Sequence, residues 1–287
     1  PIITAEPLPN VLIPTDDEVV SELAEVYPLK NEQIDFFRKN GFIKLKKVFS
    51  PGVVLKLRAE LINLLKKEFD VDPDKEAHDR FLSLEMIWPK NTLLRAYVLS
   101  PRLGKISADL LGVSAVRLYH DNVLAKQAGC GRTPWHFDDH HFPLDTNDVV
   151  TAWVPAQPTP IEMGPLSFAY PLDVHKLVNA VTFEKTGTGY DRGVSEVFKK
   201  NGVTVNETPF ELGEVSFHHN LNFHTASRNR TSRSRVALAN TYFRDGARVI
   251  NNPTMVSGDW QKFMPNISPG DVAASPLNPI CWPVDDK

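Results

Sequence analysis

The sequence is poor in cysteine and has no long hydrophobic run. Cys130 and Cys281 are the two cysteines in 287 residues, too few for the disulfide framework of a small secreted domain, which favours a reducing compartment. No apolar stretch approaches the roughly 20 residues that span a bilayer, and no charged-then-apolar leader opens the sequence at Pro1. We therefore expect a cytoplasmic protein with no membrane partner.

An excess of positive charge is also missing. The chain has 32 Lys and Arg against 35 Asp and Glu, a net charge of −3, so it lacks the basic footprint of a nucleic-acid-binding protein. Its 42% hydrophobic and 23% charged residues are ordinary for a soluble enzyme. The length allows a sizeable core, and no internal repeat is visible. We expect one domain over residues 1–287; no feature of the sequence defines its oligomeric state.

The first part of the chain is predicted to be mainly helical. Residues 1–30 are rich in proline and acidic side chains, and we expect an N-terminal extension that wraps the surface without a core of its own. Ser-Pro pairs at 50–51 and 100–101 are good helix starts, and glycines close the helical patterns. Flanking helices are expected within 31–112, over residues 31–40, 51–69 and 101–112, with a half-buried strand at 42–48.

From Ala115 the pattern changes to short β-rich runs separated by Pro, Gly, Asn and Asp. No helical pattern separates the early runs, which favours an antiparallel jelly roll, over 113–245, against a parallel α/β sheet. Residues 173–208 are a long polar insertion, either an active-site lid or a surface loop, and 246–287 form a C-terminal extension. The predicted strands are 115–126, 148–154, 166–170, 212–218, 221–226 and 235–243.

The first candidate metal ligands are His136 and Asp138. In an extended segment alternate side chains share a face, so both could bind one divalent ion. With a second imidazole they would form the 2-His-1-carboxylate triad of non-haem iron oxygenases. Taken alone, the pair is also explained by a His–Asp hydrogen bond at a strand end, and Asp138 with His140 has the same spacing.

A second histidine cluster supplies the distal ligand. His224 ends a predicted strand, and eleven residues later Arg235 opens the next. His219 stands in the same relation to Arg230, but Arg230 lies in a polar stretch unsuited to a rigid clamp, so we favour His224. For His218 and His219 we accept strand or turn packing, and His140 and His141 are expected to line the pocket or the surface.

The order His-x-Asp, distal His, then Arg at a strand start resembles the phytanoyl-CoA hydroxylase-like family of iron(II)/2-oxoglutarate dioxygenases. The resemblance covers roughly residues 32–245, with its motifs at 126–138, 162–175 and 213–235. It implies a double-stranded β-helix (a cupin-like jelly roll), with the helices of 31–112 outside one sheet. One departure is Thr225-Ala226-Ser227, where the family commonly has Gly-Ser after the distal histidine.

The resemblance also implies the chemistry. Iron(II) would be held by His136, Asp138 and His224, with 2-oxoglutarate and O2 as cosubstrates and succinate as a product. Arg235 would clamp the far carboxylate of 2-oxoglutarate, because a guanidinium is a planar, permanently charged fork. Lys126, Thr133 and Trp153 are the other candidate cosubstrate-binding residues. Because the related halogenases have Ala or Gly at the position of Asp138, a carboxylate there favours hydroxylation.

The substrate is expected to be a small organic molecule. No phosphate-gripping glycine loop or arginine cluster indicates CoA, and residues 81–88 and Tyr190, which could contact the substrate, suit a small amphiphile. Two other functions use similar ligands: a jelly-roll binding or sensing module without turnover, and a zinc hydrolase. Neither needs a carboxylate clamp, so the position of Arg235 argues against both.

Overall fold

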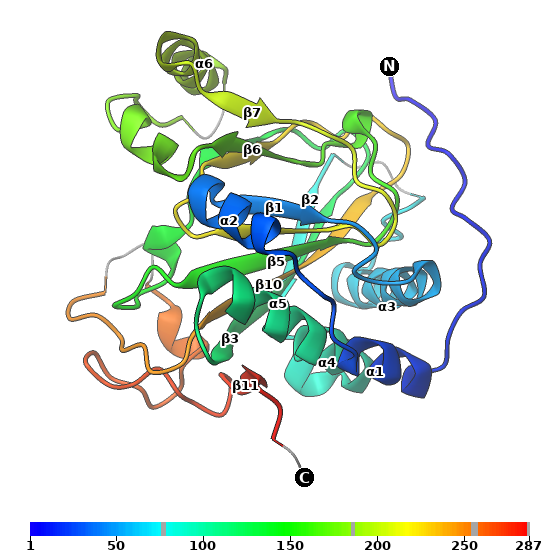
Figure 1. Ribbon diagram of the computed structural model, residues 1–287. Coiled ribbons are helices and arrows are strands. Elements are labelled where there is room, and N and C mark those ends of the chain that lie inside the picture. The colour runs from blue at the N-terminus through cyan, green and yellow to red at the C-terminus, as the bar shows by residue number, and fades with distance from the viewer. Residues whose placement is uncertain (76–78, 185–186, 254–257, 286–287) are drawn as a thin grey trace.

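Two facing antiparallel sheets form the centre of the computed structural model, which describes residues 1–75, 79–184, 187–253 and 258–285 (Figure 1). Within these residues the larger sheet has the order β1-β8-β5-β10-β3-β11, with β2 also paired to β3, and the smaller has the order β4-β9-β6-β7. The predicted jelly roll is confirmed. The strands of the larger sheet are β1 (Phe42–Leu45), β2 (Phe81–Glu85), β3 (Val116–Lys126), β5 (Val149–Pro155), β8 (Val215–His219), β10 (Arg235–Arg244) and β11 (Ile280–Trp282). Those of the smaller are β4 (Thr133–His136), β6 (Leu166–Tyr170), β7 (Thr204–Asn206) and β9 (His224–Ala226).

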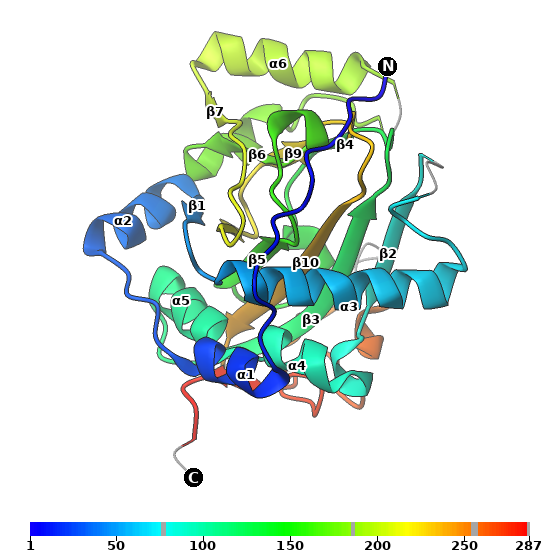
Figure 2. The same ribbon diagram turned by 90° about the vertical axis from the view of Figure 1, so that its right-hand side faces the viewer.

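Helices cover the outer face of the larger sheet. Figure 2 looks onto this face and shows α3 crossing in front of β5, β10 and β3. The predicted ends hold well: α2 and α5 end at Gly41 and Gly112, both left-handed, and the Ser100 side chain caps α5 by accepting from the Leu103 amide. The helices are α1 (Asp16–Ala24), α2 (Asn31–Asn40), α3 (Pro51–Phe69), α4 (Thr92–Val98), α5 (Pro101–Leu111) and α6 (Gly189–Asn201). The 3₁₀ helices are η1 (Trp88–Lys90), η2 (Asp139–His141), η3 (Ile161–Met163), η4 (Leu172–Val178) and η6 (Trp260–Lys262).

The N-terminal extension is anchored by a helix. We expected residues 1–30 to wrap the surface without a core of their own, and within them α1 buries Val19 and Leu23 in the main core beneath the larger sheet. Thr15 and Glu18 form a capping box that starts this helix. This helix was not predicted from the sequence, because the segment is rich in proline and acidic residues and the buried face of the helix has only two side chains.

Strand β10 separates the helix-packed core from the space between the sheets. Val236, Leu238 and Tyr242 pack into the core under the helices. Ala237 and Ala239 pack in a second cluster between the sheets. Alternate side chains of a strand point to opposite faces, so the small residues leave space on the inner face. This space becomes the cavity of the site.

A β-bulge lies in the neighbouring strand, β3. His120 pairs with Thr241 while Leu118 pairs with Tyr242, which leaves Tyr119 as an extra residue. The side chains of both Tyr119 and His120 contact the rings of Phe142 and Phe263. The bulge therefore makes the surface on which the C-terminal extension packs.

The insertion 173–208 forms a further layer on the smaller sheet. Its helix α6 lies above β6 and β7 (Figure 1), and Tyr190 and Phe198 pack against Trp135 of β4 and Phe223, which directly precedes β9. The Tyr190 hydroxyl donates to the Trp135 carbonyl at 2.8 Å. Residues 185–186 of the insertion lie outside the described residues.

The C-terminal extension is folded onto the larger sheet. β11 pairs with the start of β3, and η6 places Trp260, Phe263 and Met264 in a cluster with Tyr119 and Phe243. Residues 254–257 and 286–287 lie outside the described residues. No helix in the described ranges is long and apolar enough to cross a bilayer.

Candidate metal centre and cosubstrate pocket

His136 and His224 are direct cross-strand partners. β4 ends at His136 and β9 begins at His224, and the two residues pair across the antiparallel ladder of the smaller sheet. Their ring centroids are 4.2 Å apart. The predicted distal histidine is thus brought to the first one by strand pairing.

Asp138 joins them by a turn rather than by strand alternation. We expected residues 136–138 to be extended, but the strand stops at His136 and Asp138 begins η2 with φ −101° and ψ −6°. Its Oδ1 lies 3.4 Å from His136 Nε2, and its Oδ2 lies 3.7 Å from His224 Nε2. One ligand atom from each residue lies within 4.8 Å of the others, a spacing that can hold one metal ion.

Backbone carbonyls orient both imidazoles. His136 Nδ1 donates to the Pro134 carbonyl at 2.7 Å, and His224 Nδ1 donates to the Asn222 carbonyl at 3.0 Å. Such bonds fix the tautomer and leave Nε2 free to bind a metal. Both Nε2 atoms face Asp138, so the ligand geometry is set before a metal binds.

The electrostatics suit a cation. Burial alone would raise the pKa of Asp138, but the imidazoles of His224, His136 and His218 hold it well below its ordinary value. Burial and the nearby His136 hold the pKa of His224 well below its usual range. An ionised carboxylate beside a neutral imidazole is the protonation state that a metal site requires.

His218 is a residue whose position the sequence did not reveal. We accepted simple packing for it, yet its Nε2 lies 3.2 Å from Asp138 Oδ2, and its ring centroid lies 4.3 Å from that of His224. It projects from β8 of the opposite sheet and lines the same cavity. Its signal in the sequence was alternation: His218 follows the buried Ser216 on the inner face of β8.

Arg235 is a buried cation at the start of β10. Its side chain is 2% exposed, its Nη1 donates to the Gly164 carbonyl at 2.6 Å, and its Nε has no partner among the described residues. Its guanidinium lies 5.2 Å from the centroid of the Trp153 ring. Burial lowers its pKa to about 10. No described carboxylate lies within ion-pair distance of it, so the pocket offers an unused charge to an anion.

Glycine is required at position 164, whose carbonyl accepts the hydrogen bond from Arg235. It has φ +77°, and a Cβ there would lie 2.3 Å from the Ser227 carbonyl oxygen. A larger residue would displace the carbonyl that accepts from Arg235. This is a structural reason for the Gly-Pro-Leu motif at 164–166.

The other candidate cosubstrate-binding residues differ in whether they line the cavity. Thr133 and Trp153 line the cavity with Arg235. Lys126 is opposite Arg235 in the ladder and fully buried, donating to the Ser227 carbonyl at 3.2 Å, and it is absent from the described cavity lining. Burial and the neighbouring Arg235 lower its pKa to about 7. Lys126 is therefore a buried side chain and not a solvated surface lysine.

The alternative site does not assemble in the described structure. Arg230 is exposed, and His219 faces its own turn, where Nδ1 accepts from the Leu221 amide at 3.1 Å. His141 lines the cavity. Asp139 accepts from Asn220 Nδ2 at 3.2 Å and is outside the group of three.

A cavity of about 820 Å³ joins these parts. It runs along β10 from Arg235 to Thr241 and is bounded by β2 and by the C-terminal residues 258–263. Described residues of 173–208, including Tyr190, are absent from its lining, whereas the C-terminal extension, for which we had no role, forms a wall.

An antiparallel jelly roll with two imidazoles and one carboxylate at its centre is the arrangement of the non-haem iron(II) oxygenases. The sequence profile of the phytanoyl-CoA dioxygenase (PhyH) family matches residues 37–237, well over half of the chain. This chain belongs to that family.

Individual relatives agree. The peroxisomal phytanoyl-CoA dioxygenase of Mus musculus is 25% identical over 261 residues, covering 83% of this chain and 76% of the mouse protein. That of Rattus norvegicus is 24% identical over 250 residues, covering 78% of this chain and 71% of the rat protein.

Solved structures show the same fold. The non-haem α-ketoglutarate-dependent carbocyclase SnoK from nogalamycin biosynthesis has a TM-score of 0.69 and 25% identity, with 88% of this chain and 96% of SnoK covered. EctD from S. alaskensis with bound Fe has a TM-score of 0.60 and 19% identity, with 77% and 79% covered. The chain is an iron(II)- and 2-oxoglutarate-dependent oxygenase.

Proposed function

We propose that His136, Asp138 and His224 hold iron(II), that Arg235 binds the far carboxylate of 2-oxoglutarate, and that the enzyme hydroxylates a small organic molecule. Thr133 and Trp153 would line the cosubstrate end, and Lys126 would act on it through Arg235. The net reaction converts a C–H bond, 2-oxoglutarate and O2 into C–OH, succinate and CO2.

The observation that carries this proposal is the uncompensated charge of Arg235. A buried guanidinium without a carboxylate is costly, and a dianionic cosubstrate removes that cost. Neither a zinc hydrolase nor a sensing module needs such a group. Its free donors and its position in the cavity with the triad fit 2-oxoglutarate spanning the two.

Bound iron supplies the oxidation chemistry, through which O2 and 2-oxoglutarate are consumed. The protein's part is placement. The imidazoles of His136 and His224 are held by carbonyls, Asp138 contributes the negative charge, and Trp153 covers the guanidinium of Arg235. The carboxylate of Asp138 fills a position that a halide would otherwise take, so hydroxylation is the outcome we propose.

The cellular setting is proposed as cytoplasmic. The described chain has two buried free cysteines, Cys130 and Cys281, which suits a reducing compartment. We also propose that residues 1–287 act as one oxygenase domain, in which 113–245 is the core and 173–208 an insertion. In this arrangement the substrate enters beside β2 and the C-terminal wall.

The test is anaerobic titration with iron(II) and 2-oxoglutarate, followed by air. We expect a visible charge-transfer band from the chelate, then succinate release. His136→Ala and Asp138→Ala should abolish both while leaving the fold intact.

Asp139→Ala is the matched control for this test. It should do much less than Asp138→Ala, because Asp139 bonds Asn220 and not the metal site. If Asp139→Ala lost iron binding and Asp138→Ala kept it, the ligand assignment would be wrong by one residue.

A further inference from the structure

The cavity continues beyond the metal ligands into an aromatic end. Thr241 lies six residues after Arg235 on β10, and a strand rises about 3.3 Å per residue, so the two ends are roughly 20 Å apart. Phe142, Trp260 and Phe263 line the cavity at the Thr241 end. The Phe263 ring centroid lies 4.9 Å from that of His120, on the bulge of β3.

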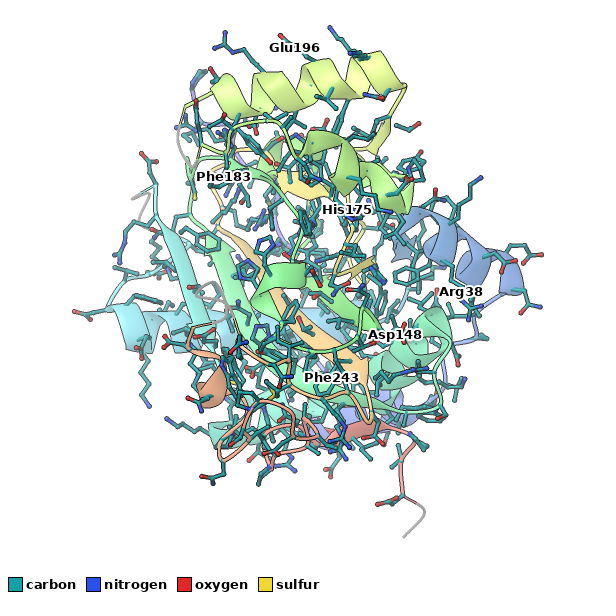
Figure 3. All side chains as sticks on the ribbon, turned by 90° about the vertical axis from the view of Figure 1, so that its left-hand side faces the viewer. Arg38, Asp148, His175, Phe183, Glu196 and Phe243 are labelled. Atoms are coloured by element: carbon teal, nitrogen blue, oxygen red, sulfur yellow. The ribbon has the colours of Figure 1, made fainter. Side chains whose placement is uncertain are left out.

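This aromatic end comes partly from outside the family's common region. The family profile ends at residue 237, whereas Trp260 and Phe263 belong to the C-terminal extension. They are held in place by packing against Tyr119 and Phe243. Figure 3 shows Phe243 in the lower half of the molecule, where this extension is folded, and Phe183 near α6 at the top.

The charges at this end do not favour an anion. Lys262 is already paired with Glu85 of β2, and Asp259 is exposed with no ion pair among the described residues. His120 on the bulge supplies no fixed positive charge either, because burial lowers its pKa. Besides Lys262, the described lining contains one other lysine or arginine, which is Arg235 at the cosubstrate end of the cavity.

We propose that the substrate is an uncharged, ring-bearing molecule whose flat apolar part lies against Trp260, Phe142 and Phe263, and that the site rejects phosphate-bearing substrates such as CoA thioesters. The inference rests on the proposed function, because the same cavity holds the iron and 2-oxoglutarate. It makes the C-terminal wall, residues 258–263, the element that determines specificity.

The physical reasons are ring contact and desolvation. Aromatic side chains bury large area and favour offset or edge-on contact with another ring. A phosphate entering this end would lose water without gaining a free cation and would meet the charge of Asp259. A cavity of about 820 Å³ shared with the cosubstrate leaves room for a molecule of drug size.

The test compares probes that share a ring and differ in charge. Anaerobic protein is loaded with iron(II) and saturating 2-oxoglutarate, which occupies Arg235. Binding of 2-naphthol, 2-naphthyl phosphate and octanoyl-CoA is then measured by equilibrium dialysis. We expect 2-naphthol to bind at least about tenfold more tightly than 2-naphthyl phosphate, which carries nearly two charges, and we expect no saturable binding of octanoyl-CoA.

Three variants locate the binding. Trp260→Ala should weaken 2-naphthol binding about tenfold, because tenfold corresponds to about 1.4 kcal/mol, which lies within the range of one aromatic ring contact. Phe183→Ala, an exposed ring of the insertion, is the matched control and should change nothing. Asp259→Lys is a surface change that preserves the fold; it should strengthen 2-naphthyl phosphate about tenfold and leave 2-naphthol unchanged.

The inference is overturned if 2-naphthyl phosphate or octanoyl-CoA binds as tightly as 2-naphthol, or if 2-naphthol does not bind. It is also overturned if Phe183→Ala weakens 2-naphthol and Trp260→Ala does not, because the insertion would then form the site. Failure of the proposed function looks different: no charge-transfer band would form, while 2-naphthol would still bind to metal-free protein and respond to Trp260→Ala.

Discussion

Arg235 is a charged side chain buried from water, and its contribution to the affinity for 2-oxoglutarate can be measured by substitution. Arg235→Ala should weaken 2-oxoglutarate binding by roughly 2–5 kcal/mol, about a hundredfold or more, because a desolvated charge pair is lost. Arg235→Lys should recover only part, since a point charge cannot replace the fork. Anaerobic titration of the iron(II) form with 2-oxoglutarate measures both.

Arg230→Ala is the control for Arg235. Arg230 is exposed, so its loss should be nearly silent. Iron affinity without 2-oxoglutarate should be unchanged in both variants. A large loss with Arg230→Ala and none with Arg235→Ala would move the distal ligand to His219.

His218 is expected to position Asp138 by donating from Nε2 to its Oδ2. His218→Leu should weaken iron(II) binding about tenfold, in the range found when partners of metal ligands are removed. His218→Gln retains a donor and should restore most of the affinity, and it should shift the charge-transfer band less than His218→Leu does. Equal loss in both variants would mean that His218 acts only through its volume.

Lys126 gives a pH-dependent prediction. Its pKa is lowered to about 7 in the folded protein from about 10.4 in an unfolded chain, so the unfolded chain binds more protons between these values. Stability should therefore rise with pH across this range and be lowest, on account of Lys126, below pH about 7.

Replacing Lys126 removes this pH-dependent contribution to the free energy of unfolding. Lys126→Met should stabilise the protein by a few kcal/mol near pH 6, and the gain should shrink towards pH 10. Thermal unfolding of both proteins across this range measures it. A gain that does not change with pH would show that the pKa of Lys126 is the same in the folded and the unfolded chain.

At the scale of elements, the packing of α1 was not predicted from the sequence. Leu23→Ala should cost about 2–5 kcal/mol, because Leu23 is fully buried in the main core. Val20→Ala on the exposed face of the same helix should change stability by less than ~0.5 kcal/mol. Equilibrium denaturation compares them, and equal small effects would contradict a packed α1.

An element could be predicted where its sequence signal lies within its own residues. α2, α3 and α5 carry cap residues and apolar stripes within their own sequence, and the strands after residue 115 carry alternation. β2 was missed because its burial depends on pairing with β3. The C-terminal wall was missed because Trp260 and Phe263 lie within a turn-rich stretch and find their partners only on the β3 bulge.

In the candidate site, too, residues with a local sequence signal were predicted, and those that depend on distant partners were not. His136 and Asp138 were predicted to lie together from their spacing, and they do, although through a turn. His218 was judged to be packing because its partner, Asp138, lies 80 residues away, in the turn that follows β4 of the opposite sheet. Long-range pairings of this kind are invisible to periodicity.

At the scale of the whole molecule, iron and cosubstrate should stabilise the fold together. 2-Oxoglutarate at about 100 times its dissociation constant adds ~2.7 kcal/mol, several degrees in Tm for a chain of this size. The shift should require iron(II), because the cosubstrate chelates the metal. Differential scanning fluorimetry under nitrogen measures it, and an equal shift after EDTA would contradict chelation.

The bulge in β3 has a consequence for how such enzymes diverge. The bulge supports the aromatic wall, residues 258–263, whereas His136, Asp138, His224 and Arg235 lie on or beside other strands. If the wall selects the substrate as we propose, substitutions in it should change which molecule is admitted without disturbing the oxidation chemistry. Grafting residues 258–263 between family members should then transfer substrate preference and leave the reaction type unchanged.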